Sequence, residues 1–272
     1  MKTLRCIISE GKQILCYPPF FACCVLVMVL EFTAGLCLIN GQEEISVIEA
    51  AATVSREQML KNTSFCSLQA FQAGSGSWFK LFVPILAGLP FVALYRDEVS
   101  TGYRRFRIAS MGKFRYCITK FITCFLGGAL AISLGTVLYG ICVAILFPSL
   151  NSYEQADIQM FLEMLNGTVP QVIGQQMLSV FLYGGFWSIV SYALIGFIHN
   201  KYLIVGIPFM LKYIWGEICL KLGGQGVEPE SLLFLFYQKE TMGITLLVYG
   251  ILSILCFLSF WIVTVRKEDL GV

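Results

Sequence analysis

The chain has 272 residues, of which 57% are apolar and 13% charged, and its formal net charge is +2 at pH 7. This low charge and a mean hydropathy of +0.75 exclude an ordinary soluble domain, in which roughly a quarter of the residues are charged. No nucleic-acid partner is expected, because the basic residues cluster beside apolar segments instead of forming one basic face. We therefore expect one all-α membrane domain, residues 1–272, embedded in a lipid bilayer.

The N-terminal segment, residues 2–15, places Ile7, Ile14 and other apolar residues among charged ones such as Glu10. This spacing predicts an amphipathic helix that lies in the membrane interface. Pro18 and Pro19 then break the chain before it enters the bilayer. A simple juxtamembrane tail remains the alternative.

Six apolar stretches follow, each near the roughly 20 residues that cross the hydrocarbon core. We expect the spans at about Phe20–Leu38, Phe79–Tyr95, Phe121–Phe147, Met177–Ile198, Tyr202–Leu222 and Ile244–Val265. Pro84 and Pro90 in the second span and Pro208 in the fifth predict kinks.

The lysines and arginines that flank the spans set the orientation, because cytoplasmic loops carry the excess of these residues. With the N-terminus inside, thirteen of them fall inside and five outside. We therefore expect a multi-pass protein of the cell membrane with both termini in the cytoplasm.

Three outer segments are longer than turns. Residues 42–61 predict a helix, and residues 152–165 predict an amphipathic helix on the outer surface. Residues 223–243 contain a short apolar core, 232–237, that is too short to cross the membrane. This stretch is either a re-entrant piece or a loop folded over the helix ends, and the sequence leaves both open.

No motif for catalysis is present. The chain lacks a Gly-x-x-x-x-Gly-Lys-Ser/Thr loop, a Gly-x-Ser-x-Gly elbow and a His-Glu-x-x-His pair. His199 is the single histidine, and Cys23-Cys24 has no companions at zinc-ligand spacing. We expect no catalytic residue, no metal site and no cofactor on this chain, and therefore no enzyme activity of its own.

Three ionisable residues fall inside apolar spans: Glu31, Lys212 and Glu217. Such residues are costly in lipid and should face protein or water. Glu31 and Lys212 lie at similar depth and could pair between helices, while Glu217 and Lys221 share one helix face. These residues form either a polar path with a proton relay or a structural ion pair.

The densest charge lies in the segment from Arg96 to Lys120, between the second and third spans. Its basic residues are Arg96, Arg104, Arg105, Arg107, Lys113, Arg115 and Lys120. Its acids, Asp97 and Glu98, are predicted with Ser100 and Thr101 to cap the start of a helix. On charge alone, the segment is equally a membrane anchor and a docking surface.

This arrangement resembles the ABC-2 type permease family, the membrane subunits of bacterial ABC exporters. The resemblance in topology covers the whole chain: an interfacial N-terminal helix, six spans, a charged segment after span two and a re-entrant-like stretch before span six. The local match covers about two dozen residues and consists of Glu98, Thr101-Gly102, Arg104–Ile108, Ser110, Lys113 and Lys120. The chain departs from the family pattern in having Ala109-Ser110-Met111-Gly112 where a proline is usual.

The resemblance implies that a separate ATPase subunit binds ATP and Mg²⁺, and that residues 97–116 supply the cytoplasmic coupling helix that docks on it. The residues carried over for coupling are Asp97, Glu98, Gly102, Arg104, Arg105, Arg107, Lys113 and Arg115. A second copy, or a similar permease, is implied as the other half of the translocation path.

The resemblance also implies that spans two and five line this path. Their aromatic residues are Phe79, Phe82, Phe91, Phe209, Tyr213 and Trp215, which suggests an amphipathic or apolar cargo such as a peptide or a lipid-linked molecule. Two rivals stay open: an ion-coupled secondary transporter that uses Glu31 and Lys212, and a membrane scaffold or immunity protein that transports nothing.

Overall fold

A computed structural model describes residues 2–37, 44–153, 167–198, 200–223, 226–237 and 240–269 of the chain. The helices before the charged segment are α1 (Lys2–Leu15), α2 (Pro18–Phe32), α3 (Val47–Thr53), α4 (Arg56–Leu60), α5 (Ser67–Ala73), α6 (Ser77–Leu86) and α7 (Leu89–Ser100). Those from the charged segment onward are α8 (Tyr103–Met111), α9 (Lys113–Leu146), α11 (Val169–Ile195), α12 (Lys201–Leu222) and α13 (Met242–Asp269). Short 3-10 turns, η1 and η2, cover Thr63–Phe65 and Leu150–Ser152.

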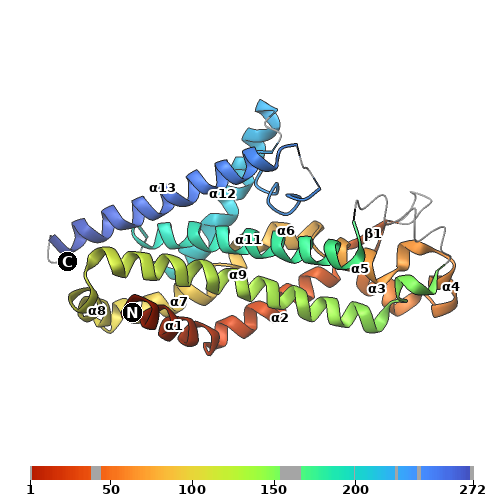
Figure 1. Cartoon of the computed structure of the whole chain (residues 1–272), viewed down its shortest axis with the longest axis horizontal. Coiled ribbons are helices and arrows are strands. Elements are labelled where there is room, and N and C mark those ends of the chain that lie inside the picture. The colour runs from red at the N-terminus through yellow and green to blue at the C-terminus, as the bar shows by residue number, and fades with distance from the viewer. Residues whose placement is uncertain are drawn as a thin grey trace.

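The described helices confirm the expectation of a helical, multi-pass membrane protein at a coarse level. Five segments are long and apolar enough to cross a membrane, and up to six if α1 and α2, bent by 59° at Pro18, are counted as one broken span. In Figure 1, α1, α8 and the end of α13 lie at one end of the molecule, and β1, α3, α4 and α5 lie at the other.

The first span is shorter than predicted. Helix α2 ends at Phe32, where the Thr33 hydroxyl donates to the Leu30 carbonyl, and the chain continues as a strand, β1 (Gly35–Cys37). This strand pairs antiparallel with β2 (Glu44–Ser46) in a two-stranded sheet that the sequence analysis did not predict. Such a short sheet has no periodicity long enough to be read from sequence.

The second span is interrupted, as its prolines predict. Helix α6 ends at Leu86 and α7 begins at Leu89, with Gly88 between them and Pro90 in the first turn of α7. A side chain at Gly88 would collide with the Ser191 hydroxyl, since a Cβ there would lie 2.5 Å from Oγ. The break therefore lets α11 approach the backbone of span two.

Helix α9 is the axis of the fold and runs along most of the molecule between α2 and α11 (Figure 1). Small residues allow this close packing: a Cβ at Gly128 would lie 2.4 Å from the Ser188 Cβ, and one at Gly135 would lie 2.8 Å from the Cys24 carbonyl. The Cys124 thiol lies 3.2 Å from the Ser188 carbonyl, so this buried cysteine acts as a small packing residue.

Helices α12 and α13 are much less covered than this bundle. In their most apolar stretches 22% and 11% of the residues are buried, against 72% in α11. In Figure 1, the C-terminal end of α13 lies near α9, and the N-terminal end of α13 lies away from it, with α12 beside α13. Their outward faces are apolar, as lipid or another apolar partner requires.

The outer segments differ from their predictions. Residues 42–61 were expected to form one helix, but α3 and α4 are separate, because Ser46 and Ser55 each begin a helix with a capping box. Of the outer helix predicted at 152–165, residues 154–165 lie outside the described residues. Residues 226–237 form successive turns with Leu232, Leu233 and Leu235 buried, which agrees with the alternative of a loop folded over the helix ends.

Candidate functional site: the buried charges beneath helix α8

Two glycines define the corner that presents α8. Gly102 (φ 71°) and Gly112 (φ 85°) adopt backbone conformations that other residues avoid, one before and one after the helix. No neighbouring atom lies within 4 Å of a Cβ built on either glycine, so conformation and not space requires them. Helix α8 is thereby set as a separate short helix between α7 and α9.

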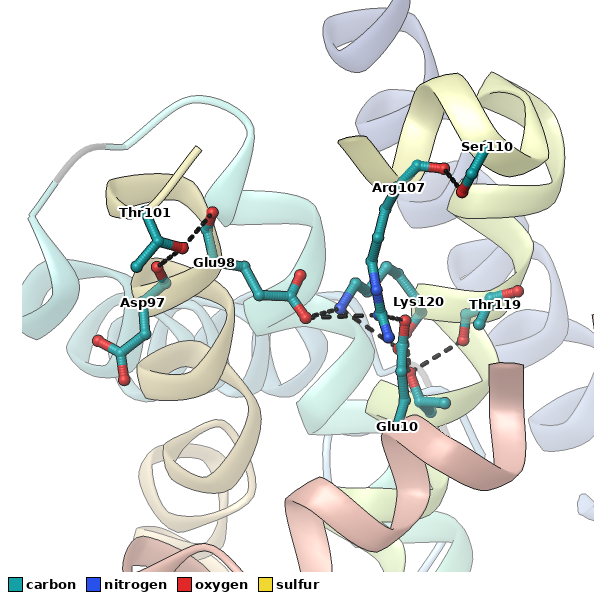
Figure 2. Close-up of polar contacts among 9 residues, drawn as sticks. Glu10, Asp97, Glu98, Thr101, Arg107, Ser110, Thr119 and Lys120 are labelled. Carbon is teal, nitrogen blue, oxygen red and sulfur yellow. Dashed lines mark hydrogen bonds and ion pairs between the residues drawn. The ribbon is translucent and has the colours of Figure 1, made fainter. Parts of the chain in front are cut away.

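Beneath α8, charges from four helices meet (Figure 2). Arg107 of α8 forms an ion pair with Glu10 of α1, and its guanidinium lies 3.5 Å from Glu98 of α7. The Lys120 ammonium of α9 lies 2.7 Å from Glu98 and 3.3 Å from Glu10. The Thr123 hydroxyl donates to the second Glu10 oxygen at 3.0 Å. We call Glu10, Glu98, Arg107 and Lys120 the inner charge cluster.

The inner charge cluster is almost sealed from solvent. The side chains of Glu10 and Lys120 are each 1% exposed, and those of Glu98 and Arg107 are 8% and 9% exposed. Burial alone would lower the pKa of the Arg107 guanidinium, but Glu10, Tyr103 and Glu98 raise it overall, so this residue stays charged. Two acids and two bases make the cluster neutral, which is the condition for keeping charges inside a protein.

The structure divides the predicted coupling residues into two groups. Glu98 and Arg107 point inward and are buried, so they are structural members of the inner charge cluster and have no surface to offer a partner. The others are at least partly exposed: Asp97, Gly102, Arg104, Arg105, Lys113 and Arg115. Asp97 points away from the cluster in Figure 2 and accepts a 2.9 Å hydrogen bond from the Tyr17 hydroxyl.

The predicted helix start at Asp97 is wrong. Asp97 and Glu98 lie in the last turn of α7, and the Thr101 hydroxyl donates backward to the Asp97 carbonyl at 2.9 Å. The residue that precedes α8 is Gly102, which has no side chain to cap it. Acids and hydroxyl residues close together suggested a beginning, but here the hydroxyls bond to the preceding turn.

The outward face of α8 is aromatic and basic. Phe106 is 68% exposed and Tyr103 is 45% exposed, and their rings stack with centroids 6.1 Å apart. Arg105 is exposed beside them. The face of Tyr103, Arg105 and Phe106 is therefore available to a partner, whereas the opposite side of α8 is held by Arg107 and Ile108.

The hypothesised pair of Glu31 and Lys212 does not form. The Thr136 hydroxyl donates to Glu31 at 2.7 Å, and the other Glu31 oxygen has no partner among the described residues. The Lys212 ammonium instead lies 2.9 Å from Glu230, which also lies 2.8 Å from Lys80 of α6. The acid that partners Lys212 comes from the outer segment 226–237, which approaches α12 only in the folded chain.

Glu230 therefore joins α6, α12 and the outer segment, and we call Lys80, Lys212 and Glu230 the outer latch. Burial raises the pKa of the Glu230 carboxyl, but the two lysines lower it overall. The segment has two further ties to α13, since Thr245 donates to the Gly226 carbonyl and Tyr249 to the Glu228 carbonyl, each at 2.9 Å. Beside the latch lies a cavity of about 310 Å³ lined in part by Lys212, Tyr213, Glu217 and Glu228.

Two of the six aromatic residues proposed to line a path are buried, three are partly exposed and one is exposed. Phe79 and Phe91 are 0% and 1% exposed, and Trp215 packs against Phe186 and Tyr249. Only Tyr213, 61% exposed, faces outward to a large extent. Phe79 and Phe91 are thus core residues, whereas Phe82, Phe209, Tyr213 and Trp215 keep exposed surface.

Sequence reasoning missed Glu10 as a site residue, although a signal was present. Glu10 falls between Ile7 and Ile14 on the face that α1 turns to the bundle, so an acid occupies the apolar stripe of an amphipathic helix. Lys120 was assigned to the basic segment, but it is buried about two turns inside α9. Both signals became meaningful only once α1 was placed against α9.

Comparison of the chain with models of known protein families, with curated proteins and with solved structures finds no match. Within the described residues, no group of three or more His, Cys, Asp and Glu side chains could hold a metal ion.

Proposed function

We propose that the chain is the permease subunit of an ATP-driven exporter in the cell membrane, with α8 as the helix that receives force from a separate ATPase subunit. The observation that carries this proposal is the mounting of α8. Its outward face is exposed and aromatic, while Arg107 on its inward side is tied to Glu10 and Glu98. A helix that transmits movement needs both an accessible face and a stiff attachment.

A simple membrane anchor would need only exposed charge. Here the attachment reaches three other helices at once: α1 through Glu10, α7 through Glu98 and α9 through Lys120. Displacing α8 therefore strains α1, α7 and α9 together, because a buried charge cannot leave its partner without a large free-energy cost. The resemblance to ABC-2 permeases in residues 98–120 favours the same role.

An orientation in the membrane, cofactors on a partner subunit and further partners follow from this proposal. By the positive-inside rule α8 faces the cytoplasm, where ATP and Mg²⁺ bind to the partner ATPase and not to this chain. A second permease copy completes the path, and the exposed apolar faces of α12 and α13 are the surfaces open to it or to lipid. The rival is an ion-coupled transporter that uses Glu31 and Lys212, which do not form a structural ion pair with each other.

Capture of the tagged chain from its native membranes tests the proposal. We expect an ATPase to copurify, and the double variant Arg105→Glu with Phe106→Ala to lose it while its unfolding temperature stays within about 2 °C of wild type, because both residues are exposed. The matched control is Lys201→Glu with Tyr202→Ala, an exposed basic and aromatic pair in the first turn of α12. Capture of a folded chain without any ATPase, or retention of the ATPase by the α8 variant, would contradict the proposal.

A further inference from the structure

A second cavity lies at the end of the molecule opposite α8. It has a volume of about 390 Å³, within the range of roughly 300–1,000 Å³ that holds small ligands. Its walls come from β1, α5, the turn between α5 and α6, α11 and the outer segment 226–237, and none of the lining residues is charged. Electrostatics therefore favours an uncharged ligand, because a charge placed here would find no partner.

The cavity wall is rich in amide groups. Gln69, Gln72 and Gln176 line it together, and at its edge the Gln72 amide donates a 2.5 Å hydrogen bond to the Tyr237 hydroxyl. Gln176 is only 4% exposed and lines the cavity, so its side chain has little contact with other solvent. Three amide side chains in one wall favour a ligand that has hydrogen-bonding groups of its own.

One strand edge also borders this cavity. Val47 donates to the Ala34 carbonyl at 2.8 Å, and Leu36 faces Ile45 across the sheet. Because hydrogen-bonded positions alternate along an antiparallel pair, Gly35 falls between two of them, and its N–H and C=O point away from β2. Gly35 lines the cavity, so it adds a backbone donor and acceptor to the glutamine amides.

We propose that this cavity binds a short, uncharged stretch of extended peptide through the peptide's own backbone amides. A free strand edge matches the alternating donors and acceptors of an extended chain, and glutamine amides can pair with the same groups. Phe234 and Tyr237, which are 37% and 45% exposed, line the cavity and would contact an apolar side chain of the peptide. That the peptide is a cargo of this chain rests on the proposed export function. The binding of the peptide to the cavity does not require an ATPase.

Saturation-transfer NMR on the full chain in lipid nanodiscs tests this binding. The probe is an acetylated and amidated hexapeptide of alternating alanine and serine, and a copy with N-methylated amides removes the donors alone. We expect the first peptide to bind and the second to bind at least about fivefold more weakly, as expected for loss of one to two hydrogen bonds. Equal binding of the two peptides would overturn the proposal, and so would binding of maltotriose in place of the peptide.

A matched pair of variants locates the site. Gln176→Leu keeps the size of the side chain and removes the amide, so we expect the affinity for the hexapeptide to fall about fivefold or more. Gln175→Leu changes the neighbouring glutamine of the same helix, which does not line the cavity, and should leave the affinity unchanged. Unchanged affinity in Gln176→Leu would overturn the site. Peptide binding without ATPase capture would support this inference and contradict the export function. ATPase capture without peptide binding would support the export function and contradict this inference.

Discussion

The two charge clusters of this protein are built from the same residue types but differ in how they are enclosed. The inner charge cluster places four nearly sealed side chains between α1, α7, α8 and α9. The outer latch places Glu230, 25% exposed, between Lys212 and Lys80, which is 35% exposed. Water reaches the outer latch but not the inner charge cluster. The inner charge cluster is therefore a fixed set of contacts, and the outer latch is a contact that can open.

The packing around the two clusters follows the same contrast. The inner charge cluster sits at the end of the α9 and α11 bundle, where glycines bring backbones close together. The outer latch joins the outer segment to α6 and to α12, a helix that is much less covered than the bundle. The chain is therefore more closely packed around its inner charge cluster than along α12 and α13.

Removing the charge of Arg107 should have the largest effect on stability. Arg107→Met leaves Glu10 and Glu98 with only Lys120 in a site that solvent does not reach, so we expect the free energy of unfolding to fall by about 3–5 kcal/mol. Thermal unfolding in detergent measures this loss. Arg105→Met on the exposed face is the control and should stay within about 0.5 kcal/mol. Equal effects of the two variants would show that the inner charge cluster is not a mount.

A glycine-to-alanine substitution should have opposite effects on stability in the closely packed bundle and in the less covered helix α13. Gly128→Ala forces a Cβ to 2.4 Å from the Ser188 Cβ, and we expect a loss of about 1–3 kcal/mol. Gly250→Ala on α13 meets no atom within 4 Å, so the better helix propensity of alanine should raise stability by about 0.5–1 kcal/mol. The same unfolding assay checks both signs, and a loss at Gly250 would mean that α13 is packed more closely than described.

Opening the outer latch should cost less than breaking the inner charge cluster. Glu230→Gln removes the charge that neutralises Lys212, and because water can reach the site we expect a loss of about 1–2 kcal/mol. Hydrogen exchange should show faster exchange in residues 226–237 with little change in α8. Glu228→Gln is the control, since Glu228 is exposed and contributes only its backbone carbonyl to the contacts described.

The smallest effect is the pH dependence of the outer latch. The folded-state pKa of Glu230 lies below its ordinary value of 4.5, so its contribution is fully present above pH 4.5 and is lost as the pH falls through the folded pKa. The difference in unfolding temperature between wild type and Glu230→Gln should be constant from about pH 8 to 6 and shrink below about pH 4. A difference that persists unchanged at the lowest pH would assign the effect to packing.

The spans and the charged segment were predictable because each depends on local pattern. Long apolar stretches must be helical in a bilayer, since the backbone has no water to bond with. The predicted end of the fifth helix, at Leu222, agrees with α12, and the break in span two followed from its prolines. The position of α8 followed from the density of basic residues between two spans.

The sequence by itself therefore determined the class of protein, the approximate helices and the segment that carries the site. Only the tertiary structure decided which charges are partners, because Glu10 and Arg107, or Lys212 and Glu230, come together through packing between distant segments. It also showed that Arg107 is buried against Glu10 and not exposed for docking, because its side of α8 faces the bundle. The residue pattern along the chain predicts which segments are helices, and the packing of these helices determines which charges pair.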